Sequence, residues 1–151
     1  MGIFRSSKAN NDELVDLLID TGPEGWQRKN AIKALNAREA NVIAAIGSEE
    51  PVLLASDTRS VGGALLLLTD QSVSLVTKHG VEKRFSFPEI AETKLYSHQN
   101  GPYVVVETHK AQRDYMPEDP KRQAHCILVQ VPTPGAANDI CAAIDSRLDV
   151  R

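Results

Sequence analysis

The chain has 151 residues, of which 42% are hydrophobic and 25% are charged, and its formal net charge is −3. This composition is typical of a folded globular protein and excludes a largely disordered chain. The acidic balance argues against a dedicated nucleic-acid-binding protein, because such proteins usually carry a basic excess that neutralises phosphates.

The chain shows no apolar run near the roughly 20 residues that span a bilayer, so we expect an intracellular, cytoplasmic protein. Cys126 and Cys141 lie in apolar segments, and their spacing matches no zinc or redox motif. We therefore expect buried free thiols rather than a disulfide. The first six residues fit the N-myristoylation pattern, with Gly2 as the acceptor. One such lipid would give only reversible membrane binding.

Residues 1–9 read as a flexible lead, and a helix is predicted after them. Asn10 and Glu13 have the spacing of a capping box, which marks a helix start. Leu14, Leu17 and Leu18 then fall on one apolar face of that helix, which should end near residue 21. Nothing obvious in the sequence covers these leucines. Either they mediate self-association, or they pack within an intramolecular helical hairpin.

A second helical segment is predicted from Pro23, which suits the first position of a helix. It is either one helix as far as Ile46 or two helices, the second restarting at a capping-box spacing that begins at Asn36. Trp26 is a core residue between this segment and the rest of the chain, or it is an anchor for a partner.

The composition changes at residues 47–51, where helix-forming residues give way to β-branched and aliphatic ones. We place a boundary there, between a helical appendage (10–47) and a β-rich domain (48–151). Seven short strands are predicted in this domain, at 52–55, 63–69, 72–77, 81–87, 92–98, 103–108 and 125–131. A last helix from Thr133 carries Ile140, Ile144 and Leu148 at intervals of four residues. This stripe predicts a helix that covers an open end of a curled sheet.

Two local motifs accompany this order of elements: LLLLTD at residues 65–70 and FPEI at residues 87–90. Together with seven strands and a final amphipathic helix, they make residues 50–148 resemble the bacterial pleckstrin-homology-like domains. The resemblance implies an α+β, mainly β fold, in which a seven-stranded curled antiparallel sheet or barrel is capped by the C-terminal helix. It also implies two nearly orthogonal sheets. The helical appendage lies outside it.

Two loops are candidate binding sites. Lipid-binding pleckstrin domains grip inositol phosphates with several basic residues between the first two strands, whereas this chain offers only Arg59 there. One basic residue contributes about 1 kcal/mol near an anionic surface, which predicts at most weak membrane association. The loop at 110–123 is long for a compact domain and is either disordered or functional. Its Tyr115 and Met116 form a candidate protein contact patch between charged residues.

The sequence carries no recognisable catalytic motif. Its four histidines are scattered without metal-ligand spacing, and no serine or cysteine lies in a known nucleophile motif. We therefore expect no cofactor and a non-catalytic binding module that acts through protein contacts. A peripheral module for anionic lipid is the alternative, and a small enzyme without a recognisable motif is a third.

Overall fold

We describe a computed structural model of the chain, at residues 13–19, 26–58, 64–98, 101–111 and 123–148. Residues 13–16 form one helical turn, after which the chain extends and Leu18 forms a parallel bridge with Leu54. The first predicted helix therefore ends earlier than expected, at residue 16 instead of near residue 21. The reason is that the backbone of Leu54 donates to Leu17 O (3.0 Å) and accepts from Ile19 N (2.9 Å), which holds residues 17–19 in an extended conformation.

Two helices follow, α2 (Trp26–Ala37) and α3 (Glu39–Ile46), so of the two alternatives the structure shows two helices, with the second capped at Arg38 and not at Asn36. The break falls at Arg38, the N-cap of α3, whose side chain makes no capping bond. Gly47 ends α3 at a positive φ of 58°, a conformation that glycine adopts without strain.

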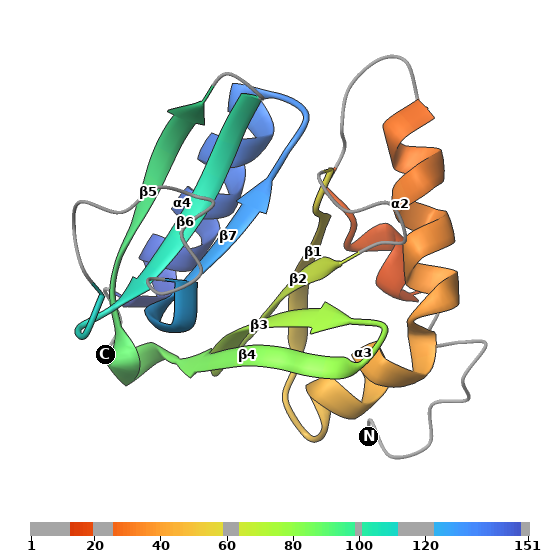
Figure 1. Cartoon of the computed structure of the whole chain (residues 1–151). Helices are drawn as coiled ribbons and strands as arrows, with labels where there is room; N and C mark the ends of the chain where they lie inside the picture. Colours follow the sequence, from red (N-terminus) through yellow and green to blue (C-terminus); the bar gives the residue numbers. More distant parts are fainter. Residues whose placement is uncertain (1–12, 20–25, 59–63, 99–100, 112–122, 149–151) are drawn as a thin grey trace.

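The β-rich part contains two antiparallel sheets (Figure 1). Within the described residues, the first sheet has the order β1 (Pro51–Ser56), β2 (Leu65–Thr69), β3 (Ser72–Thr77) and β4 (Gly80–Ser86). The second has the order β5 (Ile90–His98), β6 (Gly101–Thr108) and β7 (Cys126–Gln130). Helix α4 (Pro134–Leu148) follows β7. The α+β class, the strands and the C-terminal helix agree with the sequence analysis.

Two short 3-10 helices, η2 (Phe87–Glu89) and η3 (Gln123–His125), complete the described elements. The first turns the chain from one sheet into the other. Its Glu89 carboxylate accepts from the backbone amide and the hydroxyl of Ser86, both at 2.9 Å. These bonds hold the pKa of Glu89 below its ordinary value.

The sheets do not close into a barrel, so the barrel expected from the resemblance is wrong. Closure would need the outer edges of β1 and β7 to pair. Instead, β1 is bonded along its edge to Leu17 and Ile19. The edge of β7 is bonded to Thr58, because Gln130 O accepts from its amide (2.9 Å) and its hydroxyl (3.1 Å). Local polar contacts therefore occupy the edges of β1 and β7, so these two strands do not pair with each other.

Two apolar clusters lie on opposite faces of the first sheet. One fills the space between the two sheets and α4, and it includes Leu66, Leu68 and Ile144. The other joins the helical segment to the opposite face through Leu54, Leu65, Leu67 and Val76 of the strands. Figure 1 shows α2 and α3 on that side, away from α4. The run of leucines in β2 is thus buried on both faces, which explains why it lacks polar alternation.

Candidate functional site

The second sheet presents one face to α4 and the opposite face away from that helix. Thr93 lies on the α4 side, where its hydroxyl donates to Asp145 of α4 (2.6 Å). Since side chains alternate along a strand, Glu92 and Lys94 lie on the opposite face. The pairing of Glu92 with Glu107 and of Lys94 with Val105 extends this face onto β6. We call it the outer face of the second sheet.

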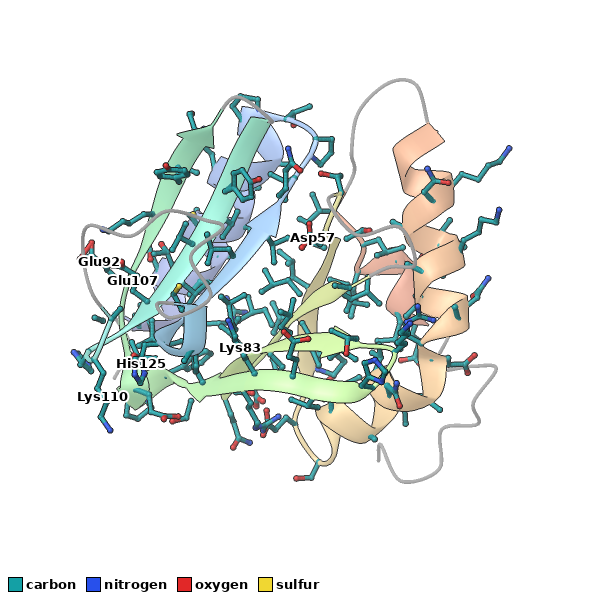
Figure 2. The ribbon with its side chains drawn as sticks, viewed as in Figure 1. Asp57, Lys83, Glu92, Glu107, Lys110 and His125 are labelled. Atoms are coloured by element: carbon teal, nitrogen blue, oxygen red, sulfur yellow. The ribbon has the colours of Figure 1, made fainter. Side chains whose placement is uncertain are left out.

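The outer face combines aromatic, apolar and charged groups. The rings of Tyr96 and Tyr103 meet edge to face, with centroids 6.2 Å apart. The carboxylate of Glu107 is only 2% exposed, and Lys94 Nζ lies 3.3 Å from its Oε1. Glu92 stands directly opposite Glu107 in the ladder, as Figure 2 shows.

The backbone of β5 has a definite polarity, which follows from the contacts of β7. Gln130 N donates to Asp57 Oδ1 (3.3 Å), and Cys126 O accepts from Lys83 Nζ (2.8 Å), so both residues direct these groups away from β6. Their partners on β6 are Tyr103 and Glu107. In an antiparallel ladder, two opposed residues either bond to each other through their backbones or both direct their backbone groups away from each other. Because Gln130 and Cys126 point away from β6, the backbone groups of Tyr103 and Glu107 point away from β7, which means toward β5.

It follows that Glu92, Lys94 and Tyr96 bond to β6, because they are the partners of Glu107, Val105 and Tyr103. The residues between them, Thr93 and Leu95, direct their amides and carbonyls away from the sheet. In the part of the chain that the structure describes, β5 has a neighbouring strand on one side only. Among the described residues, no strand pairs with this edge of β5, where Thr93 and Leu95 direct their backbone groups.

Leu95 makes this edge apolar as well as polar. Its side chain is 50% exposed, the highest value among the large hydrophobic residues that the structure describes. The other large hydrophobic residue that is exposed in the described part of the chain is Val81 on β4, at 43%. Where an extended peptide adds to a sheet, main-chain hydrogen bonds at the exposed edge give affinity and side-chain contacts give specificity.

The buried cysteines are not reactive groups. Both are free thiols, as predicted, and burial raises the pKa of Cys126 and of Cys141. The thiols therefore stay protonated at neutral pH. Cys141 contacts Lys94 O through its Sγ (3.7 Å), which links α4 to β5.

The leucines that we considered for self-association are covered by the chain itself. Leu14 is 1% exposed, and it lies with Leu18 in the cluster between the helical segment and the first sheet. Leu17 is half-buried against the same cluster, and so is Ile32. The expectation that these leucines lack a covering surface is wrong, because the sequence did not show that the first sheet presents an apolar outer face.

The other predicted site residues fall largely outside the described part of the chain. Trp26 begins α2, but its side chain is not among those described. Arg59, Tyr115 and Met116 lie outside the described residues altogether. The sequence analysis missed the β5 edge, although alternation of Glu92 and Lys94 with Thr93 and Leu95 was a signal for a strand with one charged face.

Neither a metal site nor a membrane span is found in the described part of the chain. Among the described residues, no group of three or more His, Cys, Asp or Glu side chains could hold a metal ion. Within the same ranges, no helix is long and apolar enough to cross a membrane. No family model and no curated protein matches the chain.

Proposed function

We propose that the protein is a non-catalytic, pleckstrin-homology-like module that binds other polypeptides, and that the edge of β5 is its binding element. The observation that carries this proposal is the outward direction of the backbone at Thr93 and Leu95, on a strand with one described neighbour. Main-chain bonds from such an edge supply affinity for an extended segment, and adjacent side chains supply selectivity.

The surroundings of the edge support this function. Helix α4 packs behind β5 and fixes the strand through the Thr93–Asp145 and Cys141–Lys94 contacts, so the binding element is held rigidly before a partner arrives. Pre-organisation lowers the ordering cost of binding. Leu95 and the half-buried Tyr96 offer one apolar contact on each face of the added strand.

Selection of a displayed library of nine-residue peptides against the full chain tests this proposal. Selected peptides should bind the wild type and lose binding to Leu95→Pro. The amide of Leu95 points away from β6, so proline removes an outward donor and spares the β5–β6 ladder. Val81→Thr, which alters the other exposed hydrophobic residue, is the matched control and should bind normally. Circular dichroism should show that Leu95→Pro and Val81→Thr are folded. Peptides that then bind these two variants equally would refute the β5 edge as the site.

A further inference from the structure

The charges on β5 are self-complementary, which identifies a specific occupant for its edge. Glu92 and Lys94 share the outer face and flank Thr93, whose backbone points outward. If a second copy of β5 runs antiparallel with a twofold axis at Thr93, Glu92 stands opposite Lys94 of the other copy. The twofold axis repeats the contact, so two opposite-charge pairs form at once.

We propose that the edge of β5 binds a second copy of this chain, forming an antiparallel β5–β5 pair with the twofold axis at Thr93. This inference rests on the proposed function and names the partner. In this register the outward backbone groups of Thr93 face those of the second Thr93, and Leu95 faces Ala91 of the other copy. The Thr93–Thr93 contact is a hydrogen-bonded pair of an antiparallel ladder, so the two second sheets join into one continuous sheet. Ala91 lies at the irregularity of β5, where its register against β6 shifts.

The neighbouring registers are less favourable. An axis at Glu92 would place two glutamates opposite each other, and an axis at Lys94 would place two lysines opposite each other, both of which are destabilising. An axis at Leu95 avoids these clashes but forms no lysine–glutamate pair, because Lys94 then faces Tyr96 and Glu92 faces His98.

Sedimentation equilibrium of the full chain tests this proposal. The wild type should show a concentration-dependent monomer–dimer equilibrium. Glu92→Lys converts both symmetric contacts into like-charge pairs, so it should raise the dimer dissociation constant roughly tenfold. Within the monomer, the introduced lysine would face Glu107 favourably, so the fold should persist. Glu82→Lys makes the same charge change at an exposed residue of β4 and should leave the equilibrium unchanged.

Leu95→Pro is the second variant and should yield a monomer at all accessible concentrations. A monomeric wild type, or a dimer that responds equally to Glu92→Lys and Glu82→Lys, would overturn the proposal. A monomeric wild type whose selected peptides still depend on Leu95 would overturn the homodimer alone and leave the binding function standing. If, in addition, no selected peptide depends on Leu95, both the homodimer and the peptide-binding function of the β5 edge are refuted.

Discussion

At the scale of single residues, the polar network around Thr69 joins the end of α3 to the turn between β2 and β3. The Thr69 hydroxyl donates to Glu49 Oε1 (2.5 Å) and accepts from the amides of Gln71 (3.1 Å) and Ser72 (3.0 Å). Arg84 of β4 forms an ion pair with the same glutamate. The threonine of the LLLLTD motif therefore connects the helical segment to the first sheet through its hydrogen bond to Glu49.

Replacing Thr69 by valine should destabilise the protein by about 1–3 kcal/mol. The reason is that the Glu49 carboxylate and the amides of Gln71 and Ser72 lose the hydroxyl that bonds to them. Thr77→Val is the matched control. Thr77 also accepts from a turn amide, that of His79 (3.1 Å), but this bond is exposed. Denaturant unfolding should therefore show a smaller loss for Thr77→Val, and equal losses would contradict a special role for the buried network.

The carboxylate of Glu89 should make a pH-dependent contribution to stability. Its pKa is lowered in the folded protein, from an ordinary value of 4.5, so the folded state binds fewer protons than the unfolded chain in that range. The stabilisation is present above about pH 4.5 and is lost as the pH falls through the folded pKa. The stability difference between wild type and Glu89→Gln should therefore shrink on acidification. In the Ser86→Ala background, which lacks one of the two donors, it should vary less with pH.

At the scale of elements, α4 is the best test of sequence periodicity. Ile140 and Ile144 are fully buried against both sheets, as their spacing predicted. Ile144→Ala should cost about 2–5 kcal/mol, because it leaves a cavity. Asp139→Ala, at an exposed position of the same helix, should change stability by less than about 0.5 kcal/mol. Equal effects in denaturant unfolding would mean that the helix packs differently.

The strands were predictable because each carries a local signal, and the segment at 72–77 matches β3 at both ends. Two features were not predictable. The 3-10 turn at 87–89 depends on the Ser86–Glu89 capping bonds, a helix-start pattern that lies here between two strands. The availability of the β5 edge is a property of strand order rather than of any local pattern. It required knowing that β6 is the one strand among the described residues that pairs with β5.

At the scale of the whole molecule, the helical segment and the first sheet share one apolar cluster. A chain beginning at residue 48 would expose Leu54, Leu65, Leu67 and Val76. Each such side chain contributes about 1.5–3 kcal/mol when fully buried, so the four together amount to about 6 kcal/mol or more. That approaches the whole stability of a typical domain. The truncated chain should therefore lack a cooperative unfolding transition, and a sharp thermal transition would instead support the boundary at residue 48.

The central claim is that β5 holds its edge open for another strand, and amide hydrogen exchange tests this claim most directly. In dilute wild-type protein, the amides of Thr93 and Leu95 should exchange rapidly, while those of Glu92 and Lys94 exchange slowly because they bond to β6. At high protein concentration, Thr93 and Leu95 should become protected. Slow exchange of Thr93 and Leu95 already in dilute monomer would contradict the account, because the edge would then be occupied within the chain.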